Sequence, residues 1–301
     1  MGKKYKLTEE TINVYGRTLH RIESLRDFGI VKKGDKGGFI ENEDNLSQWD
    51  DCWVYDNAQV CGNAWVFGDA KVYGDAKVYG NAKVCGNAKV SGNAKVNGNA
   101  QVYDNAQVYG KAKVYDNAQV YGDAKVCGNA WVFGDAKVSG DAWVFGDAKV
   151  YGDAKVCGNA QVCGNAKVYG DAKVNGNAWV YDNAKVCGDA RVYGNACVFG
   201  DAEIYDNVRV YGNAEVFGNV HIKGDADISS ISDYIFFKNW WSSGRCFTWT
   251  RSNNMWSVGC FYGTGEELIA KAYKDSEISG REYKRVVKYV ETTIINDGKD
   301  Q

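Results

Sequence analysis

Proline is absent from the 301-residue chain, and histidine occurs only as His20 and His221. Proline cannot donate a backbone hydrogen bond, so its absence suits a chain whose amides are nearly all committed to strand ladders. Two histidines are too few for a metal site that needs three of them. The GxSxG, HExxH, Walker and CxxC motifs are also missing. We therefore expect no enzymatic activity, no metal and no cofactor.

Neither sign of charge dominates the sequence, which has 36 Lys and Arg against 38 Asp and Glu. This balance argues against a DNA mimic and against strong non-specific nucleic-acid binding. No apolar stretch approaches the roughly 20 residues that span a bilayer, and the first residues lack the apolar run of a secretory signal. We expect a cytoplasmic protein with no membrane partner.

A six-residue unit, typically VYGDAK, repeats thirty times from Cys52 to Ser229 without an insertion or deletion. Val or Ile falls at every multiple of six from Val54 to Ile228. A small residue, nearly always Ala, lies two positions earlier. In a strand, alternation sends Ala and Val to one face and Lys and Tyr to the other. The pattern predicts a short strand in each unit.

Gly followed by Asn or Asp ends each unit, and these residues tolerate a positive φ best. The unit therefore ends in a corner, and three six-residue units make one triangular coil. Asp replaces the corner Gly five times and is always followed by Asn, which we interpret as a requirement of shape: Asp56, Asp104, Asp116, Asp182 and Asp206. The predicted fold is mainly β, a parallel β-helix of about ten coils.

The segments outside the repeat predict a cap and a second small fold, which gives three domains: 1–51, 52–229 and 230–301. The first shows short alternating strands that would cover the open edge of the first coil. The last predicts three strands, Tyr234 to Phe237, Arg245 to Thr250 and Met255 to Tyr262. Two helices follow, Glu266 to Lys274 and Arg281 to Thr292, with Thr264 and Ser279 as N-caps.

Six of the ten cysteines take the position after the valine: Cys61, Cys85, Cys127, Cys157, Cys163 and Cys187. Residues 18 apart stack on each other in such a coil, and no two of these six differ by 18. A ladder of vertical disulfides is therefore excluded, and we expect free thiols in a reducing compartment.

The run from Leu19 to Val60 resembles the N-terminal region of YdcK-type hexapeptide-repeat proteins, a bacterial and phage-borne group. The shared features of this run are SLRDF, the Gly37-Gly38-Phe39-Ile40 turn, NLSQ and DCWVYD. The resemblance implies a left-handed β-helix and supplies no reaction. Many related β-helix proteins are acyltransferases with a His base beside an interrupting loop, which this repeat lacks. Such prisms often pack in threes, so self-association is expected.

An 18-residue coil places basic and aromatic columns side by side on one face, which we call the second face. Its candidate binding residues are Lys113, Tyr115, Trp131, Phe133, Lys149, Tyr151, Lys167 and Tyr169. Such a surface can bind a polyanion or a stacked base. Alternatively, the rings stack between coils and the lysines confer solubility. We expect the other two faces to lack a continuous aromatic column.

The last segment is rich in tryptophan and arginine, and its candidate recognition residues are Trp240, Trp241, Arg245, Trp249, Arg251 and Trp256. In a domain this small some of them must form the core, and others can contact a ligand. Three functions follow, of which an acyltransferase is the least favoured because the repeat has no interrupting loop. The chain is a non-enzymatic scaffold that presents a C-terminal recognition domain to a protein partner. Alternatively, it is a phage-type inhibitor that sequesters a nucleotide, a nucleic acid or a host defence protein.

Overall fold

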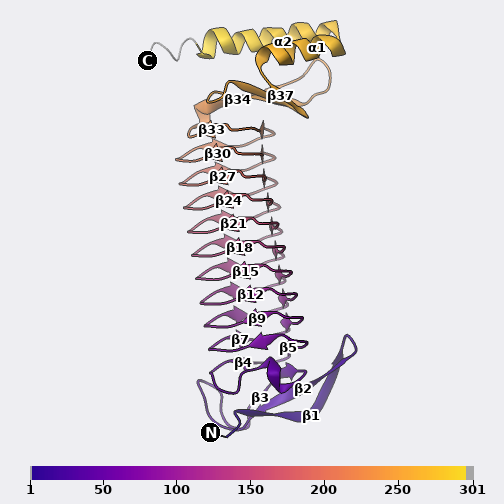
Figure 1. Cartoon of the computed structure of the whole chain (residues 1–301), viewed down its shortest axis with the longest axis vertical. Helices are drawn as coiled ribbons and strands as arrows, with labels where there is room; N and C mark the ends of the chain where they lie inside the picture. The colour runs from indigo at the N-terminus through magenta and orange to yellow at the C-terminus, as the bar shows by residue number, and fades with distance from the viewer. Residues whose placement is uncertain (1, 296–301) are drawn as a thin grey trace. The chain divides into compact units, whose positions relative to one another are not determined.

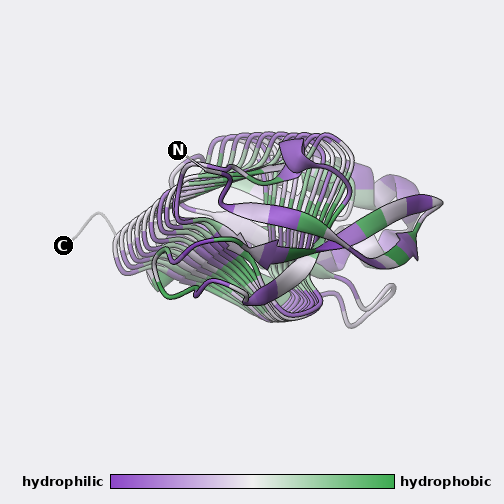
Figure 2. Ribbon diagram, turned by 90° about the horizontal axis from the view of Figure 1, so that it is seen from below, coloured by the Kyte–Doolittle hydropathy of each residue, from purple (hydrophilic) through white to green (hydrophobic). Residues whose placement is uncertain are grey.

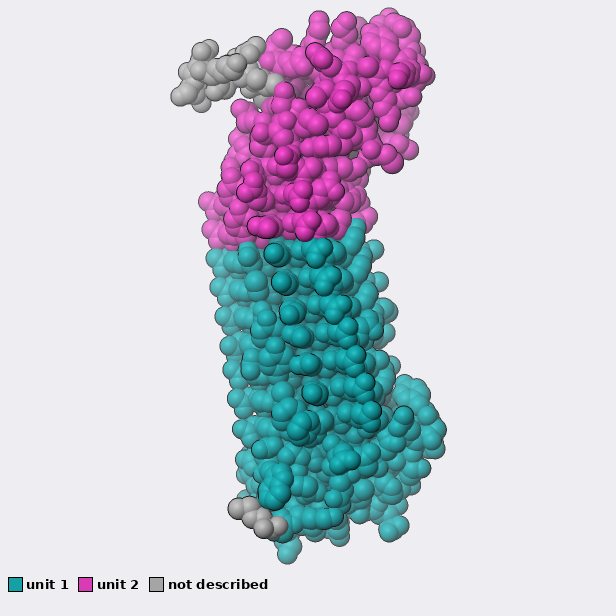
Figure 3. Space-filling model, viewed as in Figure 1, with its two compact units in different colours: residues 1–177 teal, residues 178–301 magenta. Residues whose placement is uncertain are grey.

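The computed structural model describes residues 2–295 and confirms a mainly β solenoid. The chain carries about 11 turns of parallel strands spaced about 18 residues apart, followed by a small antiparallel sheet and helices. It divides into two compact units, residues 1–177 and 178–301, which Figure 3 colours separately. This division falls inside the repeat, so the last coils group with the C-terminal segment instead of with the earlier coils.

In unit 1, each repeat forms a two-residue strand, and the strands stack in three parallel columns (Figure 1). The first face contains β4 (Trp53–Val54), β7 (Lys71–Val72), β10 (Lys89–Val90), β13 (Gln107–Val108), β16 (Lys125–Val126), β19 (Trp143–Val144) and β22 (Gln161–Val162). The second face contains β5 (Gln59–Val60), β8 (Lys77–Val78), β11 (Lys95–Val96), β14 (Lys113–Val114), β17 (Trp131–Val132), β20 (Lys149–Val150) and β23 (Lys167–Val168). The third contains β6 (Trp65–Val66), β9 (Lys83–Val84), β12 (Gln101–Val102), β15 (Gln119–Val120), β18 (Lys137–Val138), β21 (Lys155–Val156) and β24 (Lys173–Val174).

The core of the coils consists of the stacked alanines and valines that the period predicts. Val114 and Val132, for example, are directly paired one coil apart, and both have 0% exposure. Figure 2 shows hydrophilic ribbon at the bends and hydrophobic bands along the sides. Because every coil buries the same small residues, neighbouring coils share one uniform interior.

The corners have the positive φ that the sequence predicts, and their aspartates do more than fit the shape. Asp104 and Asp116 both have φ of 58°. Asp104 Oδ2 accepts a hydrogen bond from the Gly122 amide, one coil further on, at 3.2 Å. The Asp116 carboxylate accepts from the Gly134 amide in the same way, at 3.3 Å. These aspartates therefore bond to a corner amide of the next coil.

The N-terminal segment joins the solenoid directly. It contains β1 (Tyr5–Val14), β2 (Arg17–Ser24), β3 (Lys36–Ile40) and the 3-10 helix η1 (Glu43–Asn45). β1 and β2 are antiparallel, whereas β3 pairs in parallel with β5 through Ile40 and Val60. Leu46 forms a further parallel bridge with Val66. In both pairs the partners are further apart in the sequence than the 18 residues of a regular coil. The first coil is therefore longer than the others and begins before residue 52.

A buried lysine, Lys4, bonds to backbone carbonyls at the start of the solenoid. The Lys4 side chain has 0% exposure, and its Nζ donates to the carbonyl oxygens of Asp50 and Cys52 at 2.7 and 3.0 Å. Burial lowers the pKa of Lys4, and the neighbouring Cys52 thiol and Asp50 carboxylate oppose that change. The ammonium group therefore satisfies carbonyls that would otherwise be buried without a donor.

Unit 2 continues the same architecture with three further coils. Its strands are β25 (Trp179–Val180), β26 (Lys185–Val186), β27 (Arg191–Val192), β28 (Cys197–Val198), β29 (Glu203–Ile204), β30 (Arg209–Val210), β31 (Glu215–Val216), β32 (His221–Ile222) and β33 (Asp227–Ile228). Strands three apart pair in parallel, as in unit 1.

The C-terminal segment is an antiparallel sheet in the order β34-β35-β36-β37 with two helices. Its elements are η2 (Ile231–Asp233), β34 (Tyr234–Lys238), β35 (Cys246–Thr250), β36 (Met255–Val258), β37 (Phe261–Gly263), α1 (Gly265–Asp275), α2 (Glu277–Tyr289) and the π-helix η3 (Val290–Ile295). The predicted third strand is two strands, because the chain reverses at Gly259, which has φ of 54°.

The predicted N-cap of the first helix is confirmed, and that of the second is wrong. Thr264 accepts from the Glu267 amide in a capping box, as expected. The second helix begins at Glu277 because Ser276 is its N-cap and accepts from the Ser279 amide at 3.0 Å. Ser279 is therefore a residue of the first turn of α2, and the predicted start at Arg281 lies too late in the chain.

Within unit 2, the C-terminal sheet is bonded to the last coil. The Asp227 amide donates to Ser252 Oγ at 2.7 Å, and Lys223 Nζ donates to the Gly259 carbonyl at 2.6 Å. The His221 amide donates to Thr248 Oγ1 at 3.3 Å. The sheet therefore caps the strand edges of this coil, as the N-terminal segment does for the first.

Candidate functional site

The second face brings the eight predicted residues together in one column pair. Lys113, Trp131, Lys149 and Lys167 are successive partners in the parallel ladder. The rings beside them stack in a continuous file, in which the centroids of Phe133 and its neighbours Tyr115 and Tyr151 are 4.9 and 4.8 Å apart. The interplanar angles are 2° and 5°, so each ring lies flat on the next.

This geometry favours the structural interpretation of the aromatic file. A base stacks on an open ring face, but the two faces of Phe133 are covered by Tyr115 and Tyr151. Trp131 is also occupied, because Lys113 Nζ and Lys149 Nζ lie 4.1 and 5.0 Å from its ring centroid. The file therefore presents ring edges and ammonium groups, which suit electrostatic contacts better than base stacking.

The expectation that one face alone carries an aromatic file is wrong. In unit 2 the first face contains a second file, in which Phe199 stacks on Tyr181 and Phe217 with centroid separations of 4.8 and 5.2 Å. The same spacing from coil to coil could have revealed it in the sequence. A stacked file is thus a recurrent packing device of this solenoid, not a mark of one functional face.

We predict that Phe133→Ala lowers the free energy of unfolding by about 1–2 kcal/mol, because it removes two stacked ring pairs. Urea unfolding followed by circular dichroism measures this change. Phe133→Tyr is the matched control, since tyrosine occupies the positions above and below, and it should change stability by less than about 0.5 kcal/mol. Equal stability of the Ala variant and the wild type would show that the stacking contributes nothing.

His221, the histidine of the repeat, is part of an ion-pair cluster. Its Nδ1 lies 3.0 Å from a carboxylate oxygen of Glu203, and that carboxylate also accepts from Lys185 Nζ at 2.6 Å and from the Tyr205 hydroxyl. The hydrogen bond to Glu203 raises the pKa of Lys185. The imidazole therefore has a structural partner within the ladder.

The C-terminal tryptophans do not form one surface. Trp249 and Trp256 are 1% and 2% exposed and belong to the core with Phe247. Trp241 packs edge-on against Tyr283 with a centroid separation of 5.1 Å, whereas Trp240 is 77% exposed. Trp249 and Trp256 therefore serve the core that a domain this small needs, because the antiparallel sheet packs the indoles of β35 and β36 inward, whereas Trp240 stays open to a partner.

The two candidate arginines lie in different parts of the domain. Arg251 Nε donates to the Ser232 carbonyl at 3.2 Å on the surface. Arg245 lines a cavity of about 410 Å³ between the sheet and the helices. The other lining residues are Asn239, Ser242, Ser243, Val258, Cys260, Phe261, Leu268, Lys271, Ala272, Asp275, Ser276, Ser279 and Tyr283. Sequence reasoning missed the helical members, because no local pattern places a helix against a particular strand.

Polar groups surround the Tyr283 hydroxyl at this cavity. It accepts a hydrogen bond from Asn239 Nδ2 at 3.1 Å. Burial raises the pKa of Tyr283; Asp275 acts in the same direction, whereas the hydrogen bond from Asn239 and the charge of Arg245 oppose it. The raised pKa therefore keeps the hydroxyl in its neutral form.

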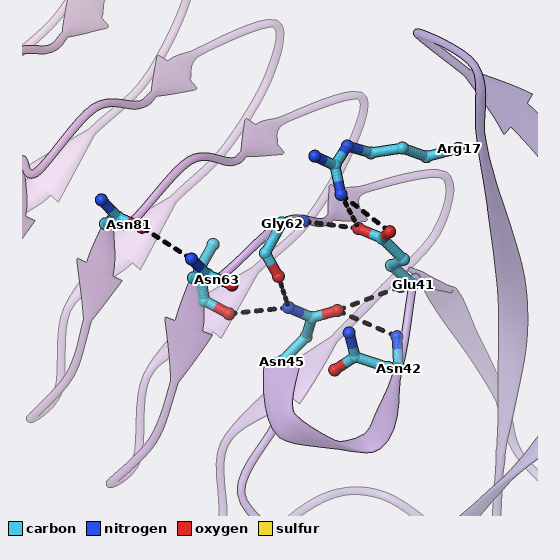
Figure 4. Close-up of polar contacts among 8 residues, drawn as sticks. Arg17, Glu41, Asn42, Asn45, Gly62, Asn63 and Asn81 are labelled. Carbon is cyan, nitrogen blue, oxygen red and sulfur yellow. Dashed lines mark hydrogen bonds and ion pairs between the residues drawn. The ribbon is translucent and has the colours of Figure 1, made fainter.

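A larger cavity of about 660 Å³ lies at the N-terminal cap and is lined by Tyr15, Arg17, Cys61, Gly62, Asn63, Tyr79, Gly80 and Asn81. Its charged group is already paired, as Figure 4 shows. Arg17 Nη1 donates to both oxygens of Glu41 at 2.8 and 2.9 Å. The Gly62 amide donates to the same carboxylate at 2.6 Å. These contacts join the cap to the first coil and leave no unpaired charge among the described lining residues.

All ten cysteines are free thiols in the structure. Cys260 is exposed, whereas Cys52, Cys61, Cys127 and Cys187 are buried. Burial also raises the pKa of the half-buried thiols Cys85, Cys157 and Cys197, which lowers their reactive thiolate fraction.

We predict that a maleimide at pH 7 reacts with Cys260 at least about tenfold faster than with the thiols of the repeat. Mass spectrometry of tryptic peptides over a time course measures the rates. Cys260→Ser should remove the fast phase and leave the slow ones. A fast phase on a repeat peptide in this variant would show that a repeat cysteine is open to solvent.

No protein-family model matches this sequence, and no curated protein sequence matches it. Among residues 2–295, no helix has the length and apolarity that crossing a bilayer requires. A function for this protein must therefore be inferred from its own residues and their geometry.

Proposed function

We propose that the protein is a non-enzymatic scaffold, in which the solenoid supports a C-terminal domain that binds a cytoplasmic partner through its cavity. One observation carries this proposal: Arg245 and Lys271 line the cavity, and neither has an ion-pair partner among the described residues. Both residues are exposed, and two cations that the fold does not use at one concavity favour a binding role.

The attachment of this domain supports the role of scaffold. Its sheet is hydrogen-bonded to the last coil through Lys223, Asp227 and His221, and the coils of unit 2 repeat without an interrupting loop. A recognition domain held by such contacts keeps a fixed orientation to the coils beneath it.

Photo-crosslinking from the cavity tests this function. Cys260, which is exposed and lines the cavity, is labelled with a benzophenone maleimide in the full chain and mixed with extract of the cells that express it. Crosslinks to one protein, reduced by unlabelled wild type and by the change Arg245→Gln, would support the proposal. A label on Lys89→Cys in the Cys260→Ser variant is the control, since Lys89 is exposed on the first face. Equal crosslinking from both positions would contradict a specific site.

A second candidate is electrostatic sequestration of an anionic polymer, as expected of a phage-type inhibitor. It is favoured by five in-register lysines on the second face of unit 1, which have no carboxylate partner in the described part of the chain: Lys77, Lys95, Lys113, Lys149 and Lys167. Like charges this close repel, and a bound polyanion would relieve that repulsion. Anisotropy of a labelled single-stranded oligonucleotide across a salt series tests this candidate. Binding that survives Lys113→Gln with Lys149→Gln would contradict it.

Self-association is a further proposal that rests on the resemblance. Light scattering with native mass spectrometry gives the mass of the assembly and any retained ligand. A trimer would support it, and a monomer at all concentrations would contradict it.

A further inference from the structure

The cavity of the C-terminal domain carries a charge pattern that selects a class of ligand. Arg245 and Lys271 are its cations, and Asp275 is its one carboxylate among the described lining residues. The Arg245 guanidinium lies over the turn at Gly259, and Lys271 Nζ lies 5.5 Å from the Phe261 ring centroid. Arg245 directly precedes β35 and Lys271 lies on α1, so an anion in the cavity would be held from two sides.

A third wall of the cavity is the start of α2, since Ser276 and Ser279 both line it. The first amides of a helix have no intrahelical acceptor, and the helix dipole places partial positive charge there. The last turn of α1 lines the same cavity and offsets part of this dipole, so the attraction on an anion comes mainly from Arg245 and Lys271.

Independent evidence for a ligand comes from the Ser279 hydroxyl. The residue is 6% exposed and lines the cavity, and its amide is bonded to Ser276 Oγ. Its own Oγ makes no hydrogen bond within residues 2–295. This oxygen is not one of the fully buried atoms without a partner, so it retains some accessible surface where its residue lines the cavity. A group that accepts a hydrogen bond from inside the cavity would give it a partner.

We propose that this cavity binds a small hydroxylated phosphate monoester. The phosphate lies between Arg245, Lys271 and the start of α2, where the Ser279 hydroxyl donates to it. The Asp275 carboxylate accepts a hydrogen bond from a hydroxyl group of the same ligand, which accounts for an acidic group in a cavity of net positive charge. The volume of about 410 Å³ suits such a compound. This inference rests on the proposed function and names the chemistry of its site.

Titration calorimetry of the full chain tests the proposal with glycerol 1-phosphate and inorganic phosphate as probes. We expect saturable binding of both, with glycerol 1-phosphate the tighter. Arg245→Gln should weaken both at least about tenfold, because it removes a charge-assisted donor pair. Ser279→Ala should weaken both by about three- to tenfold. Lys274→Gln is the matched control, since it removes the same charge from α1 at a residue outside the cavity lining, and its affinities should equal those of the wild type.

Asp275→Asn gives a signature that a merely structural role would not produce. It removes repulsion toward phosphate but weakens the contact with the ligand hydroxyl. Inorganic phosphate should therefore bind more tightly, while the preference for glycerol 1-phosphate over inorganic phosphate should shrink several-fold. Circular dichroism of each variant establishes that it is folded.

The outcomes separate this inference from the proposed function. Absence of saturable binding by both probes, or binding unchanged by Arg245→Gln, overturns the phosphate site. Tighter binding of acetate than of inorganic phosphate also overturns it, since the site would then select a carboxylate. If the probes fail while Cys260 still crosslinks to one partner, the recognition domain stands and the phosphate chemistry is wrong. If the probes bind but no partner crosslinks, the phosphate site stands and the proposal of a protein partner is wrong.

Discussion

Asn45→Ala should lower the free energy of unfolding by about 4 kcal/mol, because this side chain makes four hydrogen bonds in a fully buried position. Its Nδ2 donates to the carbonyls of Gly62 and Ala64 at 2.9 and 2.8 Å. Its Oδ1 accepts from the amides of Glu41 and Asn42 at 3.1 and 3.0 Å. Removing it leaves four backbone groups unmatched at the junction between the cap and the first coil, which Figure 4 shows.

Urea unfolding measures this loss, and hydrogen exchange at the amides of Glu41 and Asn42 should accelerate in the same variant. Asn45→Asp should be about as damaging, since it replaces two donors by acceptors that face carbonyl oxygens. Asn42→Ala is the control: its side chain caps η1 at an exposed position and accepts from the Asp44 amide, so its loss should cost only about 1 kcal/mol. A loss below about 1 kcal/mol for Asn45→Ala would show that water replaces its bonds.

The corners of the solenoid give the second large effect. Gly128 has φ of 67°, and a Cβ placed there would lie 3.0 Å from both the amide nitrogen and the carbonyl oxygen of Gly146. Valine at this corner suffers from the left-handed backbone and from the contact with the next coil. We expect Gly128→Val to cost about 3 kcal/mol. Thermal unfolding by circular dichroism measures it.

Gly128→Asp is the informative partner of this variant. Five corners of the chain already contain Asp at positive φ, and the carboxylate of Asp116 bonds to the corner amide one coil on. Asp at 128 can bond to Gly146 in the same way, and Asn129 follows it, as at every natural Asp corner. We expect a change of less than about 1 kcal/mol. If Asp were as damaging as Val, the tolerance of natural Asp corners would have another cause.

The solenoid could be predicted in detail because its contacts repeat the local pattern. Val132 is buried for the same reason as Val114, and the positive φ of Asp104 follows from its place in the unit. The hydrogen bond from the Gly122 amide to Asp104 could not be predicted from the unit, because it depends on the distance between one coil and the next. The strand β3 was missed as a rung because its spacing from β5 is wider than the period.

The C-terminal site was less predictable because it has no period. Ser276 and Ser279 are both plausible N-caps by sequence, and the choice depends on how α1 ends. Arg245 was identified by its residue type, but its neighbour Lys271 lies on a helix whose placement is set by the core around Leu268 and Val287. Residue types could be predicted here, whereas their convergence required the fold.

The strict spacing of the second face also governs how such a gene can change in length. Loss of three consecutive units within unit 1 removes one coil and restores the same columns of neighbours above and below it. Loss of a single unit keeps every valine inside, yet it would set Trp131 above Gln107 in place of Lys113. Recombination between near-identical repeats can therefore shorten or extend the protein in whole coils, whereas the loss of a single unit brings mismatched columns together at the point of the deletion.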